Sequence, residues 1–164
     1  MDSVTQWLCP QEVELDLDVP SKWEALRAVS AGLERSHRLS APGVFRALWR
    51  RETAASTGVG NGFAIPHARI TGIAEPVTAY VRTKAPLRFA APDGKPVSEL
   101  FVILVPADGA NEKHLQLLAL VAEAFLDRKF RARLAAASNP QDVRAEFARW
   151  VDARPSGAIE RSPG

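Results

Sequence analysis

Cysteine is almost missing from this sequence, since Cys9 is the only one among 164 residues. A single cysteine excludes an intramolecular disulfide and any metal site built from several cysteines, and it is compatible with a reducing compartment. The three histidines have no Cys, Asp or Glu neighbours at metal-ligand spacing, which makes a zinc site improbable. We therefore expect no metal and no other cofactor.

Long hydrophobic runs are also missing. No segment reaches the uninterrupted apolar length of a membrane span. The first residues, Met1, Asp2 and Ser3, lack the basic start and apolar run of a secretory signal. We expect a cytoplasmic protein that does not insert into a membrane.

Charge of one sign is not concentrated anywhere in the chain. The formal net charge is only +2, although the calculated isoelectric point is about 9.0, because the basic residues are scattered. The densest basic stretch, residues 128–133, is interpreted as the solvated face of a helix. The sequence therefore does not suggest a nucleic acid as partner.

The hydrophobic pattern predicts strands and helices in alternation. Residues 13–19 and 77–83 alternate between apolar and polar side chains, as a strand with one buried face does. Residues 100–105 form a continuous apolar run, which is typical of a central strand buried on both faces, and residues 63–65 predict a short strand. Turns are expected at Pro86, at residues 92–94 and at Pro96.

Helices are predicted where apolar residues recur at helical spacing behind a capping residue. Ser21, Ser40, Asn111 and Asn139 each precede such a segment, and Pro42 and Pro140 stand near two of the helix starts. With 46% hydrophobic residues, the chain can bury one core. We expect an α/β fold with a mixed central β-sheet flanked by helices, in one domain of residues 1–153, followed by a disordered tail at 154–164.

A glycine-rich stretch leads to a histidine in the middle of the chain. Residues 57–62 read Thr-Gly-Val-Gly-Asn-Gly, and Phe-Ala-Ile-Pro-His-Ala follows at 63–68. The glycines allow positive φ and close approach to a ligand, while Pro66 fixes the direction from which His67 emerges. Local chemistry alone leaves two interpretations open, a functional site or a turn beside a structural histidine. No Lys-Ser or Lys-Thr follows the glycines, so a nucleotide-binding loop is not indicated.

The wider motif resembles a known signature. Glu52, Val59-Gly60 and residues 63–68 match the phosphohistidine signature of the fructose/mannitol-type enzyme IIA domains of the bacterial phosphotransferase system. Residues 111–118, Asn-Glu-Lys-His-Leu-Gln-Leu-Leu, are similar to the second family hallmark, a histidine that opens a helix on the far side of the active site. The resemblance covers about residues 10 to 150 and is greatest to the nitrogen-regulatory branch. Ala68 stands where glycine is commoner.

The resemblance implies a role for each site residue. His67 would carry the phosphoryl group, Arg51 would supply a guanidinium with Arg50 as its nearest rival, and His114 would donate to phosphate from the start of its helix. A phosphoryl group in transfer is stabilised by positive charge and backbone amides, so the loop predicts phosphate binding by Thr57, Gly58, Gly60, Asn61 and Gly62. His37 lies in a polar connection and is excluded.

Three functions remain open at this point. The first is a regulatory phosphocarrier that accepts phosphate on His67 from an HPr-like carrier, in a relay that starts at phosphoenolpyruvate, and then binds target proteins. The second is a sugar-specific enzyme IIA that passes the phosphate to an enzyme IIB. The third is a binding module of the same fold that carries no phosphate. None would turn over a free small substrate.

Overall fold

The computed structural model describes residues 4–109 and 111–154. A 3-10 helix, one strand and two α-helices come first, five consecutive strands follow, and three α-helices complete the described chain. In chain order they are η1, a 3-10 helix (Thr5–Leu8), β1 (Glu12–Leu17), α1 (Lys22–His37), α2 (Ala41–Ala54), β2 (Gly58–Gly60), β3 (Phe63–Ala64), β4 (His67–Ile70), β5 (Val77–Leu87), β6 (Val97–Pro106), α3 (Asn111–Leu126), α4 (Arg128–Ala136) and α5 (Pro140–Ala153).

The strands form one mixed sheet in the order β1-β5-β6-β3-β2, and β4 pairs with β6 as well. The pairs β1 with β5, β3 with β6 and β4 with β6 are parallel, whereas β5 with β6 and β2 with β3 are antiparallel. The long strand β6 is therefore the centre of the sheet. The short strands β3 and β4 follow one another along the same edge of β6.

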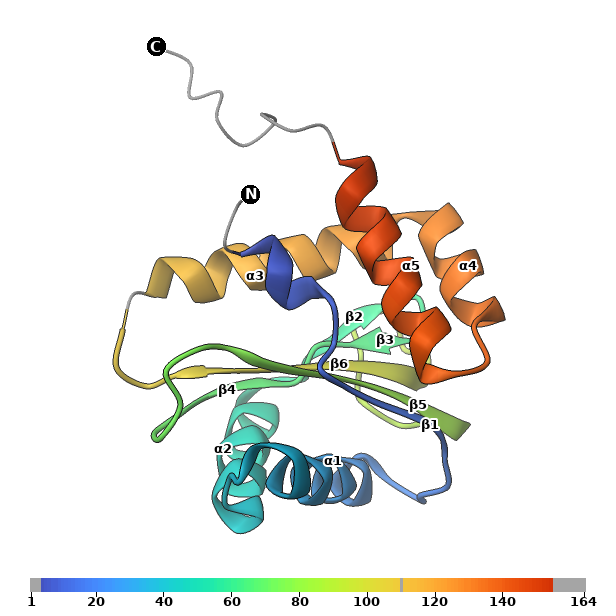
Figure 1. Cartoon of the computed structure of the whole chain (residues 1–164). Helices are drawn as coiled ribbons and strands as arrows, with labels where there is room; N and C mark the ends of the chain where they lie inside the picture. The colour runs from blue at the N-terminus through green and yellow to red at the C-terminus, as the bar shows by residue number, and fades with distance from the viewer. Residues whose placement is uncertain (1–3, 110, 155–164) are drawn as a thin grey trace.

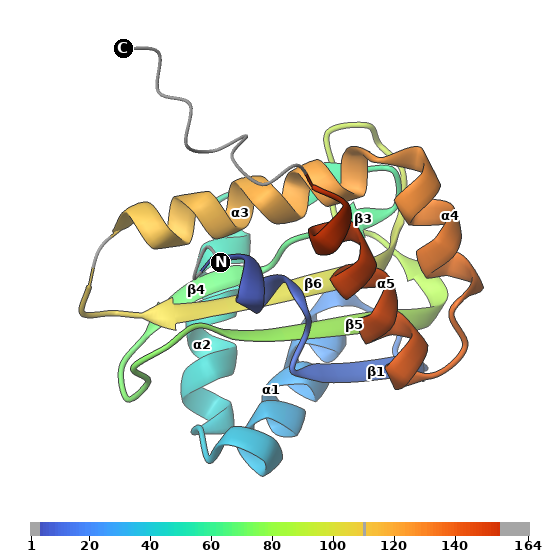
Figure 2. The ribbon, with the colours of Figure 1, turned by 45° about the horizontal axis from the view of Figure 1, so that its top comes forward.

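Helices cover both faces of this sheet (Figure 1). The pair α1 and α2 lies on one face, while α3, α4, α5 and η1 lie on the other. Figure 2 shows the same three layers after rotation, with α3 running along β6. The predicted mixed sheet flanked by helices is confirmed.

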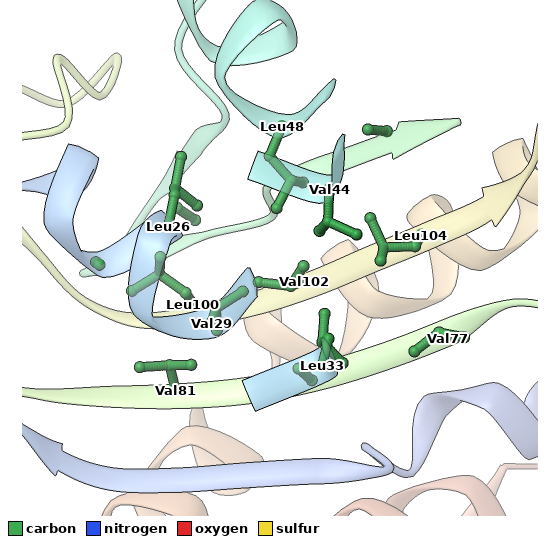
Figure 3. Packing of buried hydrophobic residues seen from close by; sticks show 14 of the residues in the cluster. Leu26, Val29, Leu33, Val44, Leu48, Val77, Val81, Leu100, Val102 and Leu104 are labelled. Atoms are coloured by element: carbon green, nitrogen blue, oxygen red, sulfur yellow. The ribbon is translucent and has the colours of Figure 1, made fainter. Parts of the chain in front are cut away.

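Two hydrophobic clusters, one on each face, join at β6. Side chains of β6 alternate, so Leu100, Val102 and Leu104 face the cluster under α1 and α2, whereas Phe101 and Ile103 face the other cluster. Residues 100–104 are all fully buried, which confirms the predicted strand with two buried faces. Figure 3 shows the first cluster, in which labelled side chains from α1, α2, β5 and β6 meet: Leu26, Val29, Leu33, Val44, Leu48, Val77, Val81, Leu100, Val102 and Leu104.

Three of the predicted helix caps are confirmed. The side chains of Ser21, Ser40 and Asn139 accept hydrogen bonds from the backbone N–H three residues later, at 3.3, 3.2 and 2.9 Å. The structure begins α3 at Asn111, but the side chain of this residue lies outside the described part, so its predicted cap stays a prediction.

The predicted turn at Pro86 is wrong, because β5 continues through Pro86 to Leu87. The strand tolerates this proline where its pairing with β6 is irregular, since the register shifts between Arg82 and Leu87. The predicted turn at residues 92–94 is confirmed, with Gly94 N–H donating to the carbonyl of Ala91 over 2.9 Å.

The described structure extends one residue into the predicted tail. Arg154, the first residue of that segment, forms an ion pair of 2.8 Å with Glu123 and lies over the ring of Trp150. The rest of the predicted tail, residues 155–164, lies outside the described residues. No helix within 4–109 and 111–154 has the length and apolar character to cross a membrane.

Candidate functional site

The backbone around His67 is held from both sides. Ile65 N–H donates to the carbonyl of Thr57 over 2.9 Å, and Ile103 N–H of β6 donates to the carbonyl of Pro66 over 2.9 Å. His67 is the first residue of β4 and pairs with Ile103. The buried Pro66 adds a fixed φ at the preceding position. The direction in which His67 leaves the sheet is therefore set by main-chain bonds as well as by the proline.

The hydrogen bonds of the His67 ring define its tautomer. Nδ1 lies 2.8 Å from the carbonyl oxygen of Ile65. A carbonyl oxygen can only accept, so Nδ1 carries the proton. Nε2 accepts a hydrogen bond from Nε of Arg51 over 3.3 Å, as a nitrogen with a free electron pair does. The neutral ring thus presents Nε2 as its nucleophilic atom.

The end of α2 places Arg51 beside His67. It lies in the last turn of that helix, and its Nη1 donates to the carbonyl of Ala55 over 2.7 Å. This bond to the helix end fixes the guanidinium while Nε reaches His67. The structure thus brings Arg51 to His67, in the place predicted from the sequence. Arg50, the rival predicted for this position, is exposed and lines the groove between α1 and α2.

His114 approaches His67 from the opposite layer. It lies in the first turn of α3, and the two imidazole rings have centroids 5.3 Å apart at an interplanar angle of 71°. Nε2 of His114 is buried and, within the described structure, has no hydrogen-bond partner. A buried donor or acceptor without a partner is costly, so this atom is available to a group that binds beside His67.

Both rings are neutral near pH 7. Burial is the main cause that lowers the pKa of His67 below its ordinary 6.5; the bond to Ile65 opposes it, the charge of Arg51 reinforces it and Glu52 opposes it. Burial, followed by the charges of His67 and Arg69, lowers the pKa of His114 to about 4. Because a nucleophilic imidazole must be unprotonated, this environment keeps His67 ready to react.

Glu52 organises the start of the glycine loop, a role that the sequence analysis did not assign. Its carboxylate is buried and accepts from both the backbone N–H and the hydroxyl of Thr57, and Lys22 of α1 lies 3.5 Å away. A buried carboxylate needs such partners. In the sequence, Glu52 stood out only by its position in the signature that this chain resembles. Its hydrogen bonds to Thr57, five residues later, could not be predicted from that position.

At three of the five positions predicted to bind phosphate, the backbone amide donates a hydrogen bond to a side chain of the protein. Thr57 gives its amide and hydroxyl to Glu52, Gly58 gives its amide to Ser56, and Asn61 gives its amide to Asp93 of the loop before β6. The amides of these three residues therefore donate within the protein, and phosphate binding by the loop stays a prediction. The other two, Gly60 and Gly62, flank Asn61, and all three have positive φ of 57° to 92° in the tight β2–β3 connection.

His114 also lines a pocket of about 420 Å³. Arg69, Glu112 and Lys113 contribute to its lining, whereas His67 and Arg51 do not. His67 thus does not contribute to this pocket. Across residues 4–109 and 111–154, no three His, Cys, Asp or Glu side chains gather where they could hold a metal ion.

Comparison with known proteins supports the resemblance. The nitrogen regulatory protein of Pseudomonas aeruginosa is 51% identical over 85 residues, which is 52% of this chain and 54%, about half, of that relative. The nitrogen regulatory protein of Klebsiella oxytoca is 39% identical over 124 residues, covering 75% of this chain and 76% of the relative.

A solved structure has the same fold. The crystal structure of nitrogen regulatory protein IIA-Ntr from Neisseria meningitidis superimposes with a TM-score of 0.79 at 38% identity, covering 88% of this chain and 98% of that one. The family model for "Phosphoenolpyruvate-dependent sugar phosphotransferase system, EIIA 2" matches residues 7–150. The chain therefore belongs to the EIIA 2 family of the phosphoenolpyruvate-dependent sugar phosphotransferase system.

Proposed function

We propose that this protein is a phosphohistidine carrier that accepts a phosphoryl group on Nε2 of His67 from the phosphohistidine of an HPr-like carrier. The observation that carries the proposal is the pair of bonds on the His67 ring, from Nδ1–H to Ile65 and from Arg51 to Nε2. Family membership supplies the relay that begins at phosphoenolpyruvate. We place the protein in the cytoplasm, with residues 1–153 as one enzyme IIA domain.

The transfer step requires no additional reactant. The electron pair of Nε2 attacks phosphorus, and the P–N bond of the donor breaks. The other ring nitrogen of the donor carries a proton, so the donor leaves as a neutral imidazole while the ring of His67 becomes a phosphorylated imidazolium. The proton on Nδ1 of His67 stays in its bond to the Ile65 carbonyl. Arg51 leaves Nε2 as the phosphoryl group arrives, and its guanidinium then donates to the phosphate oxygens.

His114 is proposed as the second donor to the phosphoryl group. Its ring stands 5.3 Å from that of His67, and its buried Nε2 gains a partner when a phosphate oxygen arrives. From the predicted loop we retain only Gly60 and Gly62 as candidates for contact with the phosphate. For Thr57, Gly58 and Asn61 we propose a supporting role, since their amides hold the loop in place.

We propose a regulatory output. Phosphorylation adds a dianionic group to a neutral imidazole, which alters the surface that partner proteins meet. The relatives named nitrogen regulatory protein favour this assignment. The family description names a sugar phosphotransferase system, so transfer to an enzyme IIB is the second candidate. The two are separated by adding an enzyme IIB to the phosphorylated protein and measuring whether its phosphate is lost.

The first test is intact-mass measurement after incubation with phosphoenolpyruvate, enzyme I and an HPr-type carrier, handled at neutral to alkaline pH. The wild-type protein should gain one acid-labile phosphate. His67→Gln should gain none, whereas the matched control His37→Gln should gain one, because His37 is the last residue of α1 and not part of the strand that carries His67. Phosphate on the His67→Gln variant would refute the assignment. No phosphate on the wild type, with active donor proteins, would favour a binding module that carries no phosphate.

A further inference from the structure

The helices α1 and α2 form the layer that covers one face of the sheet (Figure 1). A groove of about 620 Å³ lies between them. The lining residues of each helix recur three or four positions apart along one face, as Trp23, Arg27 and Ser30 do on α1. The lining comprises Trp23, Arg27, Ser30 and Ala31 of α1 and Ala41, Pro42, Phe45, Arg46, Trp49, Arg50 and Thr53 of α2.

Aromatic rings form the apolar part of this groove. Trp23 meets Phe45 edge to face at 5.3 Å, and Phe45 stacks on Trp49 at 6.1 Å. The side chain of Trp23 is 36% exposed, and Phe45 and Trp49 are only half-buried. Tryptophan is among the residues that contribute most to binding energy at protein interfaces. Rings left open to solvent at one place suggest a surface that a partner covers.

The charges at the groove all have one sign. Arg27, Arg46 and Arg50 are exposed, and Arg27 lies over the ring of Trp23 at 4.8 Å. None of the described residues that line the groove is acidic. Three positive charges without a negative one stand out in a chain whose net charge is +2. This surface is complementary to carboxylates that flank an apolar side chain.

One end of the groove lies near the last turn of α2, the turn that carries Arg51. Arg50 and Thr53 line its end near the last turn of α2, and Arg51, between them in sequence, donates to Nε2 of His67. A chain segment that lies along α2 would therefore reach the helix turn that carries Arg51. A second copy of this protein is a poor occupant, because a two-fold contact through this surface would oppose arginines with arginines.

We propose that the α1–α2 groove is the docking surface for an acidic amphipathic segment of a regulatory partner protein. Apolar side chains of the segment pack on Trp23, Phe45 and Trp49, and its carboxylates pair with the three arginines. The assignment of the partner as regulatory rests on the proposed function. The binding itself requires no phosphate and is measured without it.

The test uses a synthetic helical peptide of about four turns, with a leucine stripe flanked by glutamates. Titration is followed through the indole N–H signals of the full-length protein in two-dimensional NMR. Trp23 and Trp49 should shift saturably, while Trp7 and Trp150, which belong to the opposite layer, serve as internal references. The same peptide with lysines in place of glutamates should bind at least about tenfold more weakly.

Charge reversal distinguishes ion pairing between the groove and the peptide from nonspecific hydrophobic binding. Arg27→Glu/Arg46→Glu should lose the glutamate peptide and bind the lysine peptide, whereas the control Arg128→Glu/Arg144→Glu, at exposed positions of α4 and α5, should behave as wild type. Equal binding of both peptides, no saturable shift, or concentration-dependent shifts of Trp23 and Trp49 without peptide would overturn the proposal. Phosphorylation of the wild type on His67 is measured separately, so its failure would refute the proposed function without affecting this result.

Discussion

The imidazole of His67 has a different partner on each nitrogen, and each partner contributes a separate property. The Ile65 carbonyl keeps the proton on Nδ1 and so determines the tautomer. Arg51 faces Nε2 and adds a positive charge that, together with burial, lowers the pKa of His67. The ring is therefore neutral and oriented before any phosphate arrives. At this scale, the reactive state follows from two hydrogen bonds and the burial of one ring.

Arg51 and Arg50 are neighbours in sequence, but Arg51 contacts His67 whereas Arg50 lines the α1–α2 groove. Alanine variants of the two residues therefore serve as a test and its matched control. Arg51→Ala should slow phosphoryl transfer to His67 by about 10²- to 10³-fold, because a guanidinium aimed at developing charge is lost. Arg50→Ala should leave the rate essentially unchanged. Rates are measured by quenched incubation with the phosphorylated HPr-type carrier. A slow Arg50 variant beside a normal Arg51 variant would show that the roles are reversed.

Glu52 illustrates what residue-level reasoning could not supply. Its identity and its place in the resembled signature were visible in the sequence, yet its partners Thr57 and Lys22 come from the following loop and from another helix. Likewise, the amides of the glycine loop looked available, but Asp93 reaches Asn61 across 32 positions in the chain. Long-range contacts of this kind depend on the complete fold.

At the scale of elements, helices were predicted better than short strands. The starts of α1, α2 and α5 follow from local hydrogen bonds of Ser21, Ser40 and Asn139. The strands β2 and β4 have three and four residues and carry no clear alternation, because pairing with β3 and β6 defines them. β6 was predicted from its apolar run alone, since burial on both faces leaves a continuous pattern.

Replacement of two different glycines by alanine should have opposite effects on the stability of the fold. At Gly58 in β2, a Cβ would lie 2.7 Å from Cβ and 3.0 Å from Cα of Ala91, so Gly58→Ala should destabilise the fold by about 1–3 kcal/mol. At Gly32 in α1 the nearest atom is 3.8 Å away, so Gly32→Ala should stabilise it by about 0.5–1 kcal/mol through helix propensity. Urea unfolding measures both. A neutral Gly58→Ala would mean that the contact with Ala91 is easily relieved.

At the scale of the whole molecule, the site joins the two helical layers across the sheet. Arg51 comes from α2 on one face, His114 from α3 on the other, and His67 from β4 between them. The sequence resemblance placed these three residues in one site. Hydrophobic periodicity alone could not have done so, because it predicts which face of an element is buried and not which elements meet.

The two low histidine pKa values also affect global stability. In the folded protein the pKa of His114 is about 4 and that of His67 lies below 6.5, whereas both are about 6.5 in the unfolded chain. Between pH 4 and pH 6.5 the unfolded chain therefore binds more protons than the folded one. The free energy of unfolding therefore rises with pH in this range. The stability that the two neutral histidines contribute is lost as the pH falls from 6.5 toward 4. Glu99, whose pKa is raised by burial, has the opposite effect above its ordinary 4.5.

Replacement of His114 isolates its share of this effect. His114→Gln should unfold in urea with a weaker dependence on pH between 4 and 6.5 than the wild type, because one group that resists protonation in the folded state is gone. The contribution of Glu99 is common to both proteins and cancels in the comparison. An unchanged slope would mean that the folded protein accommodates a charged His114 without cost.

The most direct test of the whole account is to identify the phosphorylated nitrogen. The protein is labelled with ¹⁵N-histidine, phosphorylated by the HPr-type carrier, and examined by NMR for coupling between phosphorus and each ring nitrogen. We predict phosphorus on Nε2 of His67, with the proton of Nδ1 still bonded to the Ile65 carbonyl. Phosphorus on Nδ1 of His67, or on His114, would contradict the tautomer on which the proposed transfer depends.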